Sequence, residues 1–335
     1  MITLNPVLWC VATALLIHNS SWAKDSQEIS WYAGVKIRFA SRPEGIKHLA
    51  LRDAYTSSMT ELDMALRLEK MDTTAPLTID DYLYYASNQA TDWPVNEQKI
   101  ITQALGELRS GFRELRVRLP ATVLLIRTSG GEEHGAAYCR NGAVILPQQM
   151  SRTGADIGMK RLLAHELFHI ISAHNPRLRR QLYELVGYLP CTTVTLNADL
   201  KEHLVTNPDT LEMNYYATYE YQGETHPMLP IVYSRRTRGK PFHGIRYVSG
   251  KQLVLEKQGS SFVPRSKDGR PWILNNADVP EYAERLGANT NYIDHPEEAL
   301  AENFSLLVTG AQVSDPQLLA SIRKCFLEQD DPLNP

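Results

Sequence analysis

The most informative part of this sequence is the five residues His165-Glu166-Leu167-Phe168-His169. In an α-helix, side chains four residues apart lie above one another on the same face. The imidazoles of His165 and His169 can therefore reach a single metal ion. The carboxylate of Glu166 directly follows the first histidine, so it lies close enough to that ion to act on a bound water molecule. The pattern predicts a metal-binding helix.

The residues around this motif predict that the helix is buried. Apolar side chains precede, fill and follow it: Leu162, Leu163, Ala164, Leu167, Phe168, Ile170 and Ile171. Glu166 is the only Asp, Glu, Lys or Arg between Leu162 and Ser172. Burying histidines and a glutamate is costly unless a partner satisfies them, which a shared metal ion would do. We predict a helix over residues 156–173 that stops at Asn175-Pro176.

Strand patterns come directly before this helix. Residues 121–127 are rich in strand formers. Residues 135–139 and 143–146 predict two further strands, joined by the hairpin signal Asn141-Gly142. A second helix is expected after the metal-binding one, over residues 176–186. These patterns predict an α+β fold in which a mixed or antiparallel sheet packs on the metal-binding helix.

The chain divides into two parts beyond its first residues. Residues 24–118 are expected to form a mainly helical N-terminal region. It contains a strand within residues 29–41 and amphipathic helices over residues 46–70 and 95–115. Residues 119–335 are expected to form the catalytic domain, interrupted by a β-rich insertion at about residues 212–275, where strand-like segments alternate with Gly, Pro and charged residues.

Residues 1–23 predict a secretory signal peptide. They contain no Asp, Glu, Lys or Arg, and an apolar run leads to Ser21-Trp22-Ala23, a small-x-small pattern typical of a cleavage site. The run is too short to anchor the chain in a bilayer. We expect cleavage after Ala23 and a secreted or periplasmic protein without stable membrane insertion. The net charge of -3 gives no indication of a nucleic-acid partner.

The cysteines allow at most one internal disulfide. Of the four in the chain, Cys10 would leave with the signal peptide, and Cys139, Cys191 and Cys325 would remain. The sequence does not determine which two would pair, and one thiol is left over.

A third metal ligand has to come from outside the motif, because a catalytic zinc ion takes three protein ligands and leaves one position for water. The segment that starts at Pro296 predicts a helix, since proline suits the first turn and acidic residues suit the N-terminal end. Glu298 and Glu302 share a face of that helix, and Ala301 lets another helix approach closely. Glu298 is our candidate. The alternatives are Glu184, Glu297 and Glu302.

The two motifs together resemble the gluzincin branch of the zincin zinc metallopeptidases, and most closely the anthrax lethal-factor-like peptidases. The resemblance rests on H-E-x-x-H followed by Glu-x-x-Ala-Glu-x-Phe, which begins here at Glu298. It implies that Glu298 binds zinc together with His165 and His169. It also implies that Glu302 lies behind the metal and orients a ligand histidine.

The same resemblance implies two further parts of the site. A tyrosine shortly before the ligand glutamate stabilises an oxyanion, and Tyr292 is the candidate for this role. An edge strand beside the metal pairs with the substrate backbone, and residues 134–138 are the candidate strand.

Together, these residues predict a zinc-dependent peptidase with one Zn²⁺ per chain and a peptide or protein as substrate. Zinc lowers the pKa of its bound water. Glu166 accepts a proton from that water as a general base and delivers it to the leaving amine. Two alternatives come from other classes of protein. One is an exported protein that binds zinc without catalysis, and the other is a cell-wall-binding or partner-binding protein in which the motif is accidental.

Overall fold

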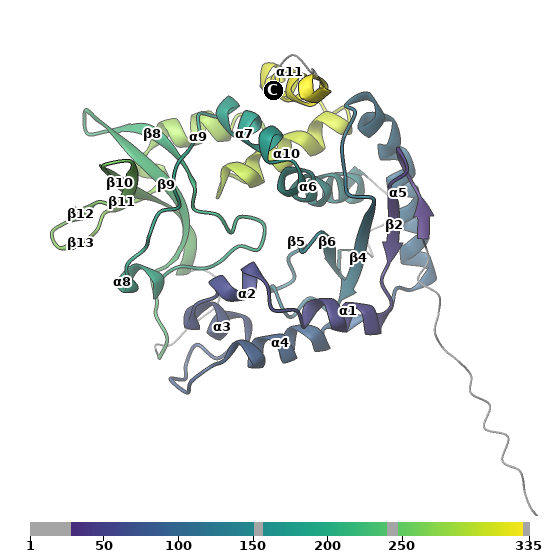
Figure 1. The fold of residues 1–335 in the computed structure, drawn as a ribbon, viewed down its shortest axis with the longest axis horizontal. Helices are drawn as coiled ribbons and strands as arrows, with labels where there is room; N and C mark the ends of the chain where they lie inside the picture. Colours follow the sequence, from purple (N-terminus) through teal and green to yellow (C-terminus); the bar gives the residue numbers. More distant parts are fainter. Residues whose placement is uncertain (1–27, 151–156, 240–246, 331–335) are drawn as a thin grey trace, which may run out of the picture.

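The computed structural model describes residues 28–150, 157–239 and 247–330, and they form a mixed α+β fold, as predicted (Figure 1). Two helices at the centre, α6 (Ile157–His174) and α10 (Pro296–Val308), lie between a mixed sheet and an antiparallel sheet. The predicted signal peptide lies outside the described residues. Within the described ranges, no helix combines the length and apolar character needed to cross a bilayer.

The first sheet combines parallel and antiparallel strands. Its strands β1, β2, β4, β6 and β5 lie in that order and span Glu28–Ser30, Lys36–Phe39, Thr122–Thr128, Ala143–Pro147 and Tyr138–Arg140. β2, β4 and β6 are parallel, whereas β1 and β5 run antiparallel to their neighbours. A short β3 (Ala90–Thr91) pairs with β4. β4 and β6 are largely buried, which suits their runs of Val, Leu and Ile.

Strands β5 and β6 form the hairpin that Asn141-Gly142 predicts. Both turn residues have positive φ angles, 50° and 72°, as a type I′ turn requires. β5 begins at Tyr138, however, and not at Gly135. His134 and Gly135 have φ angles of 53° and 85°, which take the chain out of strand geometry. The edge strand predicted over residues 134–138 is therefore wrong in its bounds, because only Tyr138 belongs to β5.

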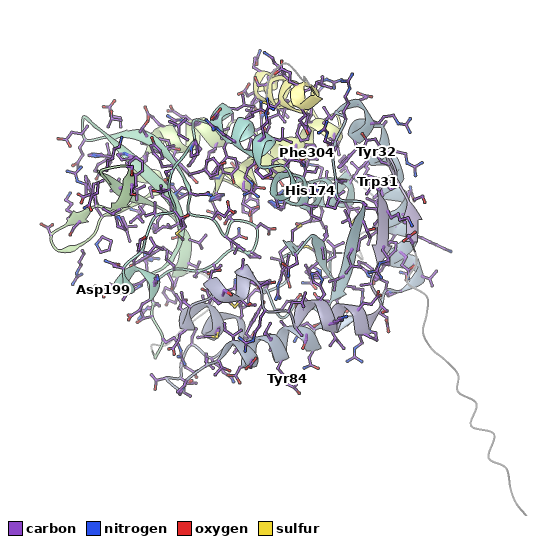
Figure 2. The ribbon with its side chains drawn as sticks, in the orientation of Figure 1. Trp31, Tyr32, Tyr84, His174, Asp199 and Phe304 are labelled. Atoms are coloured by element: carbon purple, nitrogen blue, oxygen red, sulfur yellow. The ribbon has the colours of Figure 1, made fainter. Side chains whose placement is uncertain are left out.

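Aromatic packing sets the distance between the two central helices. Phe168 on α6 and Phe112 on α5 (Val95–Glu114) both contact Phe304 on α10, with ring centres 5.5 and 5.4 Å away. All three side chains are fully buried, and Figure 2 labels Phe304 among the side chains of this region. Replacing such a phenylalanine by alanine typically costs about 3–5 kcal/mol. This contact holds the helix that carries the motif against the helix that carries Glu298.

The helix predicted over residues 46–70 is three helices: α1 (Arg42–Leu49), α2 (Ala54–Ser58) and α3 (Glu61–Arg67). The prediction was wrong because Asp53 and Thr60 each start a new helix, accepting the backbone N–H of the residue three positions later. The sequence analysis also missed α4 (Ile79–Asn88), which Thr78 caps in the same way. The helix predicted over residues 95–115 is confirmed as α5.

The predicted β-rich insertion forms a second, antiparallel sheet. Its strands β11, β10, β9, β8 and β7 lie in that order, with β14 on β10, and span Ser261–Pro264, Val248–Gln258, Glu224–Ser234, Tyr215–Tyr221, Leu189–Pro190 and Ile273–Asn275. A small hairpin, β12 (Ser266–Lys267) and β13 (Arg270–Pro271), extends from it. Leu229, Ile231 and Leu253 belong to a hydrophobic cluster, separate from the main core, that also includes Leu200 and Leu204 from the segment before β8.

Shorter helices complete the fold. α7, α8, α9 and α11 span Pro176–Leu185, Ala198–Lys201, Pro280–Leu286 and Pro316–Leu327, and 3-10 turns cover Asn276–Asp278 and Glu328–Asp330. α7 confirms the helix predicted over residues 176–186.

Candidate metal centre

Helix α6 presents His165 and His169 on one face, as the motif predicts. Their ring centres are 4.8 Å apart, and the side chains are buried. Other faces of α6 carry apolar residues of the main core, among them Leu163, Phe168 and Ile171. That packing fixes the rotation of α6 about its axis, and with it the direction of both imidazoles.

Helix α10 brings Glu298 to the same place. Its Oε2 lies 3.2 Å from Nε2 of His165 and 3.5 Å from Nε2 of His169. One ligand atom from each of the three residues lies within 4.8 Å of the other two. A tetrahedral zinc ion with nitrogen and oxygen ligands at about 2.0–2.2 Å separates them by roughly 3.3–3.6 Å. Both distances to Oε2 fit a shared zinc ion.

The outer nitrogens of both histidines also face carboxylates of α10. Nδ1 of His165 lies 3.0 Å from Oε1 of Glu302, and Nδ1 of His169 lies 3.3 Å from Oε1 of Glu297. Two further donors hold Glu297: the Ser172 Oγ at 2.9 Å and the Tyr183 hydroxyl at 2.8 Å. A carboxylate that accepts the Nδ1 hydrogen leaves Nε2 with a free lone pair for a metal. Glu302 and Glu297 thus lie behind the histidines rather than beside Glu298.

The buried charges of this centre compensate one another. Burial opposes a charge on His165, but hydrogen bonds with Glu298 and Glu302 raise its pKa to about 9. Despite its own burial, Glu298 has a pKa well below the usual range, because His169 and His165 lie beside it. Protons and metal ions compete for the same imidazole lone pairs. A metal ion here is expected to bind more weakly as the pH falls.

Glu166 lies beside the three candidate ligands and is 3% exposed. Burial raises its pKa, although the two histidines act in the opposite direction. A raised pKa suits a carboxylate that has to accept a proton from water. The thiol of Cys139, on β5, donates a hydrogen bond to the carbonyl oxygen of Glu166 at 3.0 Å. The same Sγ lies 3.5 Å from Oε2 of Glu166. The edge strand of the first sheet therefore adjoins Glu166.

The structure also brings Tyr292 to the centre. Its ring stacks on that of His165 with the centres 5.9 Å apart and the planes at 10°, and the residue remains 44% exposed. Burial and the neighbouring Glu298 raise the pKa of its hydroxyl, which therefore keeps its proton and can donate it in a hydrogen bond. His295 accepts the N–H of Glu297 at 3.1 Å and so caps α10.

Glu184, the remaining alternative ligand, lies elsewhere. It is exposed on α7 and pairs with Arg180 at 2.8 Å, one helical turn away. The structure does not bring it to His165 and His169. The three cysteines expected in the mature chain, Cys139, Cys191 and Cys325, are free thiols.

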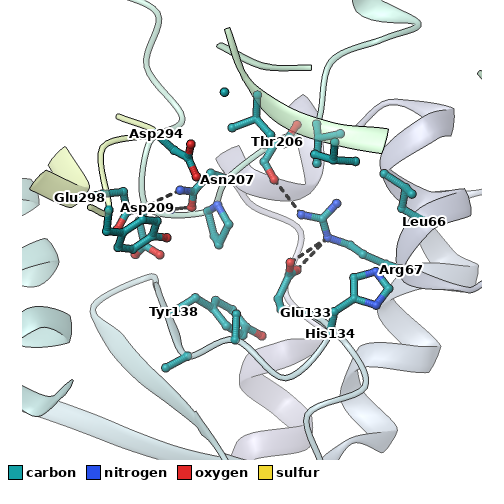
Figure 3. A pocket seen from close by; sticks show the side chains of 18 of the residues that line it. Leu66, Arg67, Glu133, His134, Tyr138, Thr206, Asn207, Asp209, Asp294 and Glu298 are labelled. Carbon is teal, nitrogen blue, oxygen red and sulfur yellow. Dashed lines mark hydrogen bonds and ion pairs between the residues drawn. The ribbon is translucent and has the colours of Figure 1, made fainter. Parts of the chain in front are cut away.

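A cleft of about 1010 Å³ opens in front of the centre. Figure 3 shows Glu298 and Asp209 on one side of it and Arg67 and Glu133 on the other. The wall of this cleft that contains Asn207 and Asp209 was not predicted from the sequence. Asn207 donates its side-chain amide to Oε1 of Glu298 at 2.7 Å. The only signal in the sequence is the turn-forming run Asn207-Pro208-Asp209, which predicts a loop and says nothing about what it contacts.

No family model, curated protein or solved structure matches this chain.

Proposed function

We propose that this chain is an exported, zinc-dependent peptidase with a zincin-like fold. The observation that carries the proposal is the convergence of His165, His169 and Glu298 at one point beside Glu166. Two imidazoles and one carboxylate are a ligand set typical of catalytic zinc, which keeps a fourth position open for water. The mixed sheet beside α6, with β5 at its edge, supports the zincin-like assignment.

The proposed reaction is hydrolysis of a peptide bond. His165, His169 and Glu298 would hold a zinc ion, which would supply Lewis acidity to the reaction. Glu166 accepts a proton from the attacking water, which its raised pKa favours, and passes it to the leaving amine. The Tyr292 hydroxyl, kept protonated, donates a hydrogen bond to the oxyanion that develops on the carbonyl oxygen.

Substitution of the proposed base tests this function. Glu166→Gln keeps the size of the side chain and removes its ability to accept the proton. We expect the variant to bind zinc as the wild type does while kcat on a peptide substrate falls by about 10² to 10⁴. Glu184→Gln is the matched control, because that glutamate is exposed and remote, and it should behave as the wild type.

Three results would contradict the proposal. Wild-type turnover by Glu166→Gln would remove Glu166 from the mechanism. A wild-type protein that binds zinc and cleaves no peptide from a diverse library would favour the non-catalytic zinc-binding alternative instead. Binding to isolated cell wall without any bound zinc would favour the cell-wall-binding alternative.

A further inference from the structure

The free edge of β5 is covered by another part of the same chain. β5 is the last strand in the order of the first sheet, and among the described residues Cys139 pairs with Val144 of β6 on one side and with no strand on the other. The backbone N–H of Cys139 donates to Oδ1 of Asp209 at 2.9 Å. An aspartate side chain thus takes the position that the carbonyl of a neighbouring strand would take in an extended sheet. We call residues 205–209, which carry this aspartate, the strap.

The strap also contacts the metal centre. Asn207 donates its side-chain amide to Oε1 of Glu298 at 2.7 Å, while its own Oδ1 accepts the N–H of Asp209 at 2.9 Å. One short turn therefore joins the candidate metal ligand to the edge of β5. The carboxylate of Asp209 lies within 4.8 Å of ligand atoms of both Cys139 and Glu166. The strap crosses the side of the centre where β5 meets the proposed base.

A buried charge network anchors the start of the strap. Thr206 donates its N–H to Oδ1 of Asp63 at 2.7 Å and its hydroxyl to Oδ2 at 2.9 Å, and its carbonyl oxygen accepts from Arg67 at 2.7 Å. Arg67 also pairs with Asp63 at 3.0 Å and with Glu133 at 2.8 Å. Figure 3 shows Arg67 between Thr206 and Glu133. On its other side, Val205 donates its N–H to Val232 of β9 at 2.9 Å.

The contacts of the strap differ in the free energy that is needed to break them. Asp63 and Arg67 are 0% and 4% exposed, so releasing Thr206 would take hydrogen bonds away from charged groups that water cannot easily reach. The contacts of Asn207 and Asp209 face the cleft, and a peptide entering the cleft can replace them. A backbone carbonyl of an extended peptide is the natural substitute for Asp209 as acceptor of the Cys139 N–H. The strap can open at residues 207–209 while Thr206 stays anchored.

We propose that the strap is an autoinhibitory contact that blocks the edge of β5 until an extended peptide displaces Asp209 from Cys139. This proposal rests on the proposed peptidase function. The substrate backbone pairs with β5 only after the hydrogen bond between Asp209 and the Cys139 amide has broken. The cost of breaking it reduces the apparent affinity for extended substrates.

Three variants test the strap. Asp209→Ala removes the acceptor, whereas Asp209→Asn keeps an oxygen acceptor and removes only the group that can carry a charge near Glu166. Asp199→Ala makes the same change as the first variant at an exposed position on α8. Each zinc-loaded protein is assayed with a quenched fluorescent peptide long enough to span the cleft. Exchange of the Cys139 amide hydrogen is measured by nuclear magnetic resonance on the same samples.

We expect Asp209→Ala to lower KM for the long peptide about tenfold and to speed exchange of the Cys139 amide at least tenfold, since the hydrogen bond from that amide to the side-chain oxygen is lost. Asp209→Asn and Asp199→Ala should resemble the wild type in both measurements. An unchanged KM with unchanged exchange in Asp209→Ala would overturn the proposal. Equal changes in Asp209→Ala and Asp209→Asn would overturn it too, because the charge and not the contact would then be responsible.

Failure of the peptidase function gives a different result. If no protein, wild type included, cleaves any peptide although each binds zinc, the proposed function fails. The autoinhibitory role of the strap is then tested by measuring the affinity of each protein for the uncleaved long peptide. About tenfold tighter binding by Asp209→Ala than by Asp209→Asn supports it, and equal binding overturns it.

Discussion

The two sides of the cleft use buried charge in different ways. On the α6–α10 side, His165, His169 and Glu298 direct one ligand atom each toward a common point. On the α3 side, Asp63, Arg67 and Glu133 direct their charged atoms toward one another. The first arrangement suits a cation between its members, whereas in the second each charge already faces one of opposite sign. Burial of charge alone therefore does not distinguish a reactive site from a structural one, and the direction of the atoms does.

We expect the largest effect when the buried ion pairs on the α3 side of the cleft are broken. Arg67→Met leaves Asp63 and Glu133 as buried, unpaired carboxylates and should lower the free energy of unfolding by up to about 5 kcal/mol. Urea unfolding measures this. Arg52→Met is the matched control, because Arg52 pairs with Asp80 at the exposed surface and should lose little. Equal losses in both variants would contradict a structural role for the α3 network.

Substitutions on the α6–α10 side of the cleft should change zinc affinity rather than folding stability. Glu298→Ala removes one of three ligands and should weaken zinc binding by about 4 kcal/mol, roughly a third of the binding free energy of a protein zinc site. Competition with a chromogenic chelator measures the Kd. Glu184→Ala should bind zinc as the wild type does. If Glu184→Ala loses zinc and Glu298→Ala keeps it, the ligand assignment is wrong.

Glu132 is a buried glutamate that belongs to neither of these two groups of charged residues. Among the described residues, neither carboxylate oxygen of Glu132 has a hydrogen-bond partner, and burial raises its pKa to about 7. The folded state therefore holds this proton more tightly than the unfolded chain does. This contribution to stability is complete below pH 4.5, declines as the pH rises, and is lost above about pH 7.

Glu132→Gln should therefore stabilise the protein by about 3 kcal/mol at pH 8 and have almost no effect at pH 4. Thermal unfolding at the two pH values measures the difference. A stabilisation that is the same at both pH values would show that the proton on Glu132 is not its cause.

The smallest effect belongs to the carboxylates behind the histidines. Glu302→Gln and Glu297→Gln remove the negative charge opposite Nδ1 of His165 and His169. Each should weaken zinc binding by a factor of about 10 to 100, or about 1–3 kcal/mol. The chelator competition used for Glu298→Ala detects this. Wild-type affinity in both variants would mean that these contacts do not support the ligands.

The placement of the side chains on the α6–α10 side of the cleft could be predicted from the sequence almost completely. The i, i+4 spacing of His165 and His169, and of Glu298 and Glu302, specifies which side chains share a helix face. Pro296 and the acidic residues after it mark where the second helix starts. Packing of the two helices then brings the faces together, and no finer detail of the loops is needed.

The opposite side could not be predicted in the same way. Asn207 and Asp209 lie in an irregular loop, whose contacts depend on how distant parts of the chain fold and not on a periodic pattern. The split of residues 46–70 into three helices was available from the capping residues Asp53 and Thr60. Helical periodicity outweighed those signals in the prediction. The early turn at His134 and Gly135 likewise moved the start of β5 to Tyr138.

The zinc content of the purified mature protein shows whether the chain binds zinc at the proposed site. Elemental mass spectrometry on folded protein that has never been exposed to chelator should find about one zinc ion per chain, and Glu298→Ala should lose it under the same conditions. Folded wild-type protein that holds no zinc, even after incubation with excess zinc and removal of the unbound metal, would contradict the account.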